Sequence, residues 1–274
     1  MKLTVAHSPD PDDAFMFYAW THGKISSNYE LEETLSDIET LNKEAKNGKY
    51  HISAISYHAL PYVTDKYDLM SVGSSVGDKY GPILISKKPL STLENKVIAL
   101  PGELTTATLV FRIYSQNHKE VFVPFDQIME KVMNSEVDAG LLIHEGQLSY
   151  KNMGLEKVVD LGEWWYEKHS LPLPLGGNIL HKSLKKESRE INNLLRESIK
   201  WGKSNLDEAL GHAMKYGRDL DLEMGEKFVN MYVNDFTIKF QESLYKSLNV
   251  LYKLAYEKSL IPSIPNIPED ILNE

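Results

Sequence analysis

Polar side chains stand at or soon after the ends of four short apolar segments that the sequence predicts to be strands. Ligands of open α/β sheets bind beyond the carboxyl ends of the strands, so these positions are candidates for a binding site. The candidates, in chain order, are His7 and Ser8, Ser56, Thr105 and Thr106, and His144. Their hydroxyl groups suit an anion, and an imidazole suits proton transfer. The pattern predicts one small-molecule site at a sheet edge.

His144 is the strongest candidate for a catalytic acid or base. Imidazole is the side chain whose ordinary pKa lies nearest neutrality. His144 follows the segment AGLLI at 139–143, which carries no ionisable group and predicts a buried, rigid strand. The alternative is a core or surface histidine bonded to the backbone, which position alone favours.

Thr105 and Thr106 stand where a helix is expected to begin, after the strand at 97–100 and the turn at Pro101-Gly102. Free N–H groups at a helix start, together with two hydroxyls, form a cradle for a carboxylate or phosphate. The alternative is an ordinary helix cap without a ligand, which is the commoner use of threonine at such a position.

Other chemistries have little support in this sequence. His144 and Glu145 are adjacent and would point to opposite faces of a strand, and the acidic cluster Asp10, Asp12 and Asp13 suits a helix start better than a metal site. No metal ligand set and no nucleotide-binding glycine motif is present, so we expect neither metal nor cofactor. The chain has no cysteine, which excludes disulfides and thiolate chemistry. The formal net charge of −9 disfavours nucleic acid as a partner.

Short apolar strands alternate with helical patterns, which predicts an α/β protein. We expect strands at 3–6, 52–56, 82–86, 97–100, 139–143 and 176–180, and helices at 12–22, 41–47, 105–114 and 128–133. The last third changes character. Apolar stripes at helical spacing, from Ile191, Leu206 and Leu244 onward, predict helices packed on an existing sheet, followed by an extended proline-rich tail after Ile261.

Two internal similarities predict two lobes. NGKYHISAISYH from Asn47 and NSEVDAGLLIHE from Asn134 are each a helix end, a turn and a strand that closes in polar residues. GPILISKKPL from Gly81 and GGNILHKSL from Gly176 are each a strand followed by a basic step, and they bracket the middle of the chain. We therefore expect a two-strand hinge, with residues 1–88 and 176–274 in lobe one and residues 89–175 in lobe two.

The start of the chain predicts a cytoplasmic location. Residues 2–6 already form a strand pattern, with no signal peptide before it, and no apolar run approaches the length of a membrane span. We expect a small carboxylate as the partner, and neither nucleic acid nor membrane.

Longer motifs make the sequence resemble a known family. They are HSPDPDDAFMFYAWTHGKI near the start, DIETLNKEA at 37–45, the Ser56-Tyr57 step, GPILIS at 81–86, PGELTTA at 101–107, AGLLIHEGQLSY at 139–150, VVDLGEWW at 158–165, LPLPLGGNIL at 171–180 and YVNDFT at 232–237. Together they are similar to the 1,4-dihydroxy-6-naphthoate synthases of the futalosine route to menaquinone, and they run through most of the chain.

The resemblance implies the two-lobed fold of periplasmic solute-binding proteins of type II. It implies a cofactor-free carbon–carbon lyase that converts cyclic dehypoxanthinyl futalosine to 1,4-dihydroxy-6-naphthoate. The family's catalytic base falls on His144, its threonine pair on Thr105 and Thr106, and its cleft asparagine and serine on Asn42 and Ser56. These residues, with Ser8, form the expected site.

One departure and two alternatives accompany the resemblance. Bacterial members often read SPCPNDTF where this chain reads SPDPDDAF, and aspartate in place of asparagine adds repulsion near an anionic ligand. The chain would then be a branch with a different substrate. The alternatives are a binding protein that delivers a small anion to a transporter, because the fold is shared, and a sibling enzyme such as a chorismate dehydratase.

Overall fold

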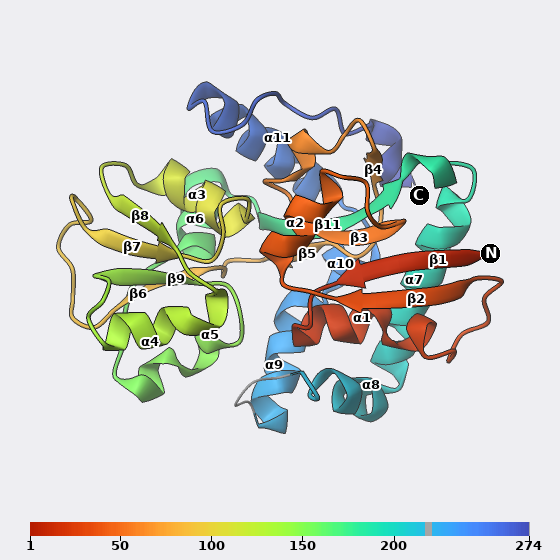
Figure 1. Ribbon diagram of the computed structural model, residues 1–274, viewed down its shortest axis with the longest axis horizontal. Coiled ribbons are helices and arrows are strands. Elements are labelled where there is room, and N and C mark those ends of the chain that lie inside the picture. Colours follow the sequence, from red (N-terminus) through yellow and green to blue (C-terminus); the bar gives the residue numbers. More distant parts are fainter. Residues whose placement is uncertain (217–220, 274) are drawn as a thin grey trace.

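The computed structural model describes residues 1–216 and 221–273, and it shows two sheets side by side (Figure 1). In the described residues the first sheet has six strands in the order β2 (Glu30–Leu35), β1 (Lys2–His7), β3 (Ile52–Ser56), β11 (Leu173–His181) and β4 (Tyr67–Leu69), with β5 (Ser75–Gly77) also paired to β11. The second has five, in the order β10 (Glu156–Asp160), β6 (Ile83–Ser86), β9 (Ala139–Leu142), β7 (Val97–Leu100) and β8 (Lys119–Phe122). We call the two halves the first lobe and the second lobe.

Both sheets are mixed. In the first, β1 runs parallel to β2 and β3, whereas β11 is antiparallel to β3, β4 and β5. In the second, β7 is parallel to β8 and β9, whereas β6 is antiparallel to β9 and β10. The carboxyl ends of the parallel strands β1, β3, β7 and β9 therefore lie toward the junction between the lobes (Figure 1). The polar candidates stand at these strand ends.

The chain crosses from one sheet to the other between β5 and β6, and returns between α6 (Leu161–His169) and β11. Two short connections therefore join the lobes at the hinge. The sequence interpretation that residues up to 88 belong to lobe one is wrong for β6, which pairs with β9 and β10 of the second sheet. Its apolar residues suit either interior, so the strand pattern alone did not indicate which sheet would take it. The rest of the predicted division stays a prediction.

Helices cover both faces of the second sheet (Figure 1). On one side lie α3 (Thr106–Tyr114) and α6, and on the other α4 (Ile128–Met133) and α5 (Gly146–Ser149). The strands alternate to match: Ile98 and Leu100 face the cluster that includes α3, whereas Ala99 faces the cluster that includes α4. All three side chains are fully buried.

The first sheet carries α2 (Ile38–Ala45), α1 (Pro11–Thr21) and most of the C-terminal helices, as the apolar stripes predicted. These helices are α7 (Ser188–Ser204), α8 (Leu206–Ala213), α9 (Leu222–Tyr232), α10 (Asp235–Ile238) and α11 (Glu242–Glu257). Helix α1 packs against α7, α8 and α9 as well as the sheet, so its apolar residues are buried all round: Phe15, Met16 and Phe17 are each at most 1% exposed.

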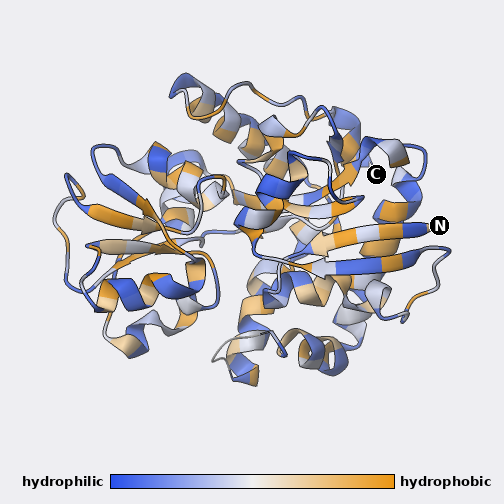
Figure 2. Ribbon diagram, in the orientation of Figure 1, coloured by the Kyte–Doolittle hydropathy of each residue, from blue (hydrophilic) through white to orange (hydrophobic). Residues whose placement is uncertain are grey.

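Apolar residues gather on the inner strands of both sheets, and hydrophilic residues on the outer turns of the helices (Figure 2). One core cluster extends across the junction, because it contains Tyr57 of the first lobe, Leu100 of the second and Tyr252 of α11. No helix in the described part of the chain is both long and apolar enough to cross a membrane.

Candidate functional site

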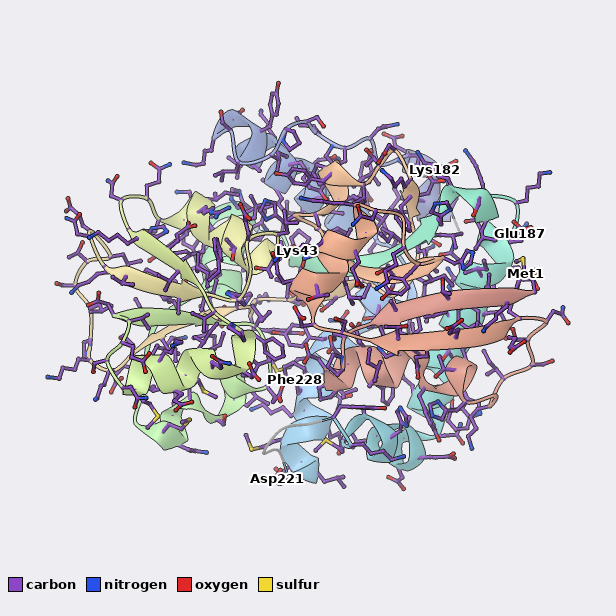
Figure 3. The ribbon with its side chains drawn as sticks, in the orientation of Figure 1. Met1, Lys43, Lys182, Glu187, Asp221 and Phe228 are labelled. Atoms are coloured by element: carbon purple, nitrogen blue, oxygen red, sulfur yellow. The ribbon has the colours of Figure 1, made fainter. Side chains whose placement is uncertain are left out.

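A cavity of about 730 Å³, the open solvent at its mouth included, lies where the two lobes meet. The first lobe contributes the end of β1, the start of α1, the end of β3 and the last turn of α9, and the second contributes the start of α3 and the segment after β9. Phe228 of α9, on the cavity wall, lies at the junction of the lobes (Figure 3).

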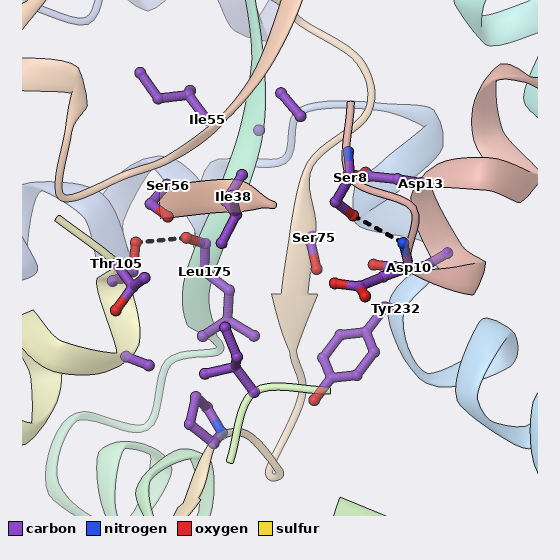
Figure 4. Close-up of a pocket in the computed structure, with 18 of the residues that line it drawn as sticks. Ser8, Asp10, Asp13, Ile38, Ile55, Ser56, Ser75, Thr105, Leu175 and Tyr232 are labelled. Atoms are coloured by element: carbon purple, nitrogen blue, oxygen red, sulfur yellow. Dashed lines mark hydrogen bonds between the residues drawn. The ribbon is translucent and has the colours of Figure 1, made fainter. Parts of the chain in front are cut away.

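Hydroxyl groups line one side of the cavity, where Ser56 and Thr105 stand (Figure 4). Thr105 is the N-cap of α3, and its hydroxyl oxygen accepts the N–H of Thr108 at 3.3 Å. The Thr106 hydroxyl accepts the N–H of His58 at 3.2 Å and donates to the carbonyl of Leu175. Both predicted threonines therefore lie at the cavity, and both also hold the structure together there.

Asn42 stands one step behind this wall. It is fully buried, and its Oδ1 accepts the N–H of Ser56 at 2.8 Å. Its Nδ2 donates to Ser56 Oγ at 3.0 Å and to the carbonyl of Leu104 at 3.3 Å. Asn42 thus positions Ser56 and ties α2 to the residue before the α3 cap. It does not line the cavity, which differs from the expected direct contact with substrate.

Carboxylates line the opposite side, where Ser8, Asp10 and Asp13 lie near Tyr232 (Figure 4). Asp13 Oδ2 accepts the N–H of Ser8 at 2.9 Å, and Ser8 Oγ accepts the N–H of Asp10 at 3.2 Å. Asp12 also lines the cavity. Burial and then the neighbouring Asp13 and Asp10 raise the pKa of Asp12 well above its usual range.

The cavity therefore has one side of hydroxyls at a helix N-terminus and one acidic side. None of the described lining residues is a lysine, arginine or histidine. In the described part of the chain, no group of three His, Asp, Glu or Cys residues is placed to hold a metal ion. A carboxylate is favoured at the hydroxyl side, where the residues at the positive end of α3 line the cavity, and is disfavoured at the acidic side.

His144 follows β9 as expected, but its ring is turned into the second lobe. The side chain is 5% exposed. Nδ1 accepts the N–H of Gly146 at 3.0 Å, and Nε2 lies 3.1 Å from the carbonyl of Phe125, to which it can only donate. The His144 ring can lie this close to the backbone of residue 146 only because that residue is glycine, since a Cβ there would lie 2.6 Å from His144 Cε1. The neighbours Ile143 and Gln147 line the cavity, but the imidazole itself does not, contrary to the expectation.

Two lining residues that the sequence analysis did not select meet across the junction. The hydroxyl of Tyr232, at the end of α9, donates to Gln147 Oε1 of α5 at 2.9 Å. Both residues fall inside motifs that carried the family resemblance, YVNDFT and AGLLIHEGQLSY. Neither stands directly at a strand end, so the rule that selected the other candidates passes over both.

Comparison with known proteins agrees with the resemblance. The family model described as menaquinone biosynthesis matches residues 3–257. A Thermus thermophilus protein named 1,4-dihydroxy-6-naphtoate synthase is 35% identical over 264 residues, covering 96% of this chain and 97% of that protein. A Streptomyces coelicolor protein of the same name is 32% identical over 269 residues, covering 96% and 95%.

Solved structures show the same fold. The crystal structure of an Archaeoglobus fulgidus protein superposes with a TM-score of 0.92 at 48% identity, covering 95% of this chain and 98% of that one. The periplasmic aliphatic sulphonate binding protein of Escherichia coli superposes with a TM-score of 0.69 at 10% identity, covering 100% and 99%, which confirms the solute-binding-protein fold and no more. Taken with the family model and the two relatives, these matches show that the chain belongs to the menaquinone biosynthesis family and is an enzyme.

Proposed function

We propose that this enzyme converts cyclic dehypoxanthinyl futalosine to 1,4-dihydroxy-6-naphthoate, with release of a three-carbon fragment. The observation that supports this best is the cavity between the lobes, with hydroxyls at one side and carboxylates at the other. Such a lining suits a molecule with one carboxylate and a hydroxyl-rich remainder. The names of the Thermus and Streptomyces relatives give the product, and the family resemblance implies the substrate.

Ser56, Thr105 and Thr106 bind the substrate carboxylate in this proposal. The N-terminus of α3 stabilises a negative charge there, and the hydroxyls of Thr105 and Thr106 turn from the carbonyls of Gly102 and Leu175, to which they now donate, to donate to the carboxylate. Asp10, Asp12 and Asp13 line the other side. Carboxylates there accept hydrogen bonds from hydroxyls, and the charges of Asp10 and Asp13 repel a second anion. Ser8, held by Asp13 through its N–H, completes that side. The ligand is therefore bound in one orientation.

His144 is the general base in this proposal. It takes the proton of a substrate hydroxyl, whose oxygen forms a carbonyl as the adjacent carbon–carbon bond breaks. The electron pair of that bond passes through the ring to a ring carbonyl oxygen, which receives the proton back from His144 and becomes a hydroxyl of the product. The ring becomes aromatic in this step, and that gain supplies much of the driving force. The step needs only proton transfer, so we propose no metal and no cofactor. Nδ1 accepts the Gly146 N–H here and the ring lies outside the cavity lining, so the ring must give up that bond and turn toward the cavity before it takes a proton.

Steady-state kinetics with mass-spectrometric detection of 1,4-dihydroxy-6-naphthoate test the proposal. A positioned base contributes about 10²–10⁴-fold, so His144→Gln is expected to lose that factor in kcat while it still binds product. His22→Gln, at the exposed end of α1, is the matched control and should keep full activity. Near-normal kcat in His144→Gln would remove His144 from the mechanism.

The same assay separates the other candidates. A protein that only binds and delivers a small anion would bind the naphthoate but form no product from the cyclic substrate. A chorismate dehydratase would consume chorismate instead. Product formation that continues after treatment with a chelator supports a reaction without metal, and loss of turnover that added metal restores would contradict it.

A further inference from the structure

The hydrogen bond between Tyr232 and Gln147 joins the two lobes inside the cavity wall. Tyr232 belongs to the first lobe and Gln147 to the second, and their side chains are 3% and 5% exposed. A hydrogen bond shielded from water at such a junction resists opening more than one on the surface does. This bond therefore opposes separation of the lobes at the cavity.

Tyr232 is held firmly on the side of the first lobe. Its ring packs edge to face against Tyr80, with ring centroids 5.8 Å apart, and against Phe228 at 5.0 Å. The Thr237 hydroxyl donates to the Tyr232 carbonyl at 2.8 Å. Tyr80 lies in the connection between β5 and β6, so the phenol is anchored at the hinge itself.

Gln147 is tied to His144 and to the strand end just before it. Its Nε2 donates to the carbonyl of Leu142 at 3.3 Å, and its N–H donates to the carbonyl of His144 at 3.0 Å. The remaining amide atom, Oε1, accepts from Tyr232. One side chain therefore connects the phenol to the segment 142–147. Burial raises the pKa of the Tyr232 phenol, so the hydroxyl stays a donor throughout the working pH range.

We propose that Tyr232 is a positioning residue: through Gln147 it latches the lobes over the cavity and sets the place of the segment that carries His144. The latch rests on the proposed function for its effect on turnover, but not for its effect on closure. Opening of the cavity to admit substrate then requires this bond to break, and closure remakes it beside the bound ligand.

Tyr232→Phe removes the hydroxyl and keeps the ring. The net value of one hydrogen bond corresponds to a change of about 2–10-fold in an opening equilibrium. We expect the amides of residues 144–149 to exchange with deuterium faster by that factor, and small-angle X-ray scattering without ligand to give a larger radius of gyration. With substrate, kcat should fall and KM should change little, because the phenol acts through Gln147.

Two further variants keep the test decisive. Tyr245→Phe removes a hydroxyl that donates to Ile267 at 3.4 Å, away from the cavity, and should leave exchange at 144–149 unchanged. Gln147→Met keeps the length of the side chain, and the double variant with Tyr232→Phe should be no more open than either single one, because both break the same bond.

The outcomes distinguish the latch from the proposed function. Wild-type exchange and radius in Tyr232→Phe, or additive effects in the double variant, would overturn the latch whatever the reaction. Failure of the wild-type protein to form the naphthoate would overturn the proposed function and leave the exchange and scattering results to decide the latch.

Discussion

Asp160 offers a test of how burial and helix capping compete at one carboxylate. It is the N-cap of α6, where Oδ1 accepts the N–H of Gly162 at 2.8 Å and of Glu163 at 3.0 Å. These bonds favour the charged form, but burial outweighs them and raises the pKa of Asp160 to about 6. The helix start it caps lies against the hinge, since Leu161 N–H donates to the Pro82 carbonyl at 2.9 Å.

The folded protein therefore binds a proton at Asp160 more tightly than the unfolded chain, whose carboxyl has a pKa near 3.8. The stability that this proton contributes is fully present below about pH 4 and is lost as the pH rises through 6. Two pH units at about 1.4 kcal/mol each give about 3 kcal/mol, which solvent around the helix terminus reduces to about 1–2 kcal/mol.

Asp160→Asn removes the charge and keeps an oxygen that caps equally well. We expect the variant to exceed the wild type by about 1–2 kcal/mol in the free energy of unfolding at pH 8, and to match it at pH 4. Urea denaturation followed by circular dichroism measures the difference. Asp221→Asn, at the exposed cap of α9, is the control for loss of a capping carboxylate. If Asp160→Asn is less stable than the wild type at pH 8, burial does not dominate and the reasoning fails.

Three other predictions concern the hinge and the cavity. Gly162→Ala should lower the free energy of unfolding by at least about 2 kcal/mol, because its Cβ would lie 1.9 Å from the Tyr80 carbonyl oxygen. The control Gly211→Ala in α8, where a Cβ would meet nothing within 4 Å, should raise the free energy of unfolding by up to about 1 kcal/mol. Urea denaturation measures both variants, and equal stabilities would contradict the prediction. Asn42→Ala leaves the buried N–H of Ser56 without its acceptor and should cost about 1–3 kcal/mol and weaken naphthoate binding in calorimetry; unchanged stability would show that the bond is dispensable. Asp12→Asn removes a charge beside Asp10 and Asp13, so its stability relative to the wild type should increase as the pH rises from 4 to 8, and it should bind the naphthoate more tightly. Thermal melts at both pH values test the stability, and a gain confined to pH 4 would refute the prediction.

The inner strands and the longer helices could be predicted because each is specified by local pattern. Residues 52–56 and 97–100 are short apolar runs without charge, and they form β3 and β7 with the expected bounds. The spacing in 128–133 likewise predicts α4. The polar positions that follow these strands bring Ser8, Ser56 and the threonine pair to one cavity. A strand end and a helix start are local features, so a linear pattern is enough to find them.

Two features could not be predicted without the tertiary structure: the edge strand β2 and the sheet to which β6 belongs. The strand β2, ELEETL, carries three glutamates and is not among the strands that the sequence predicts. Strand β1 supplies its hydrogen-bond partners along the whole length, and the side chains of β2 are exposed or half-buried. The apolar strand β6 fits either interior, and pairing with β9 placed it in the second sheet. Strand pairing is a contact between distant segments, which periodicity does not encode.

The sequence by itself determined an α/β protein with hydroxyls and a histidine at the ends of its strands. Only the tertiary structure decided where those side chains point. The carbonyl of Phe125 and the N–H of Gly146 together turn the His144 ring away from the cavity, and Asn42 is drawn behind Ser56 by three hydrogen bonds. The physical reason is that a side chain's direction is set by whichever partners the folded chain brings within about 3 Å, and those partners come from segments far away in the sequence.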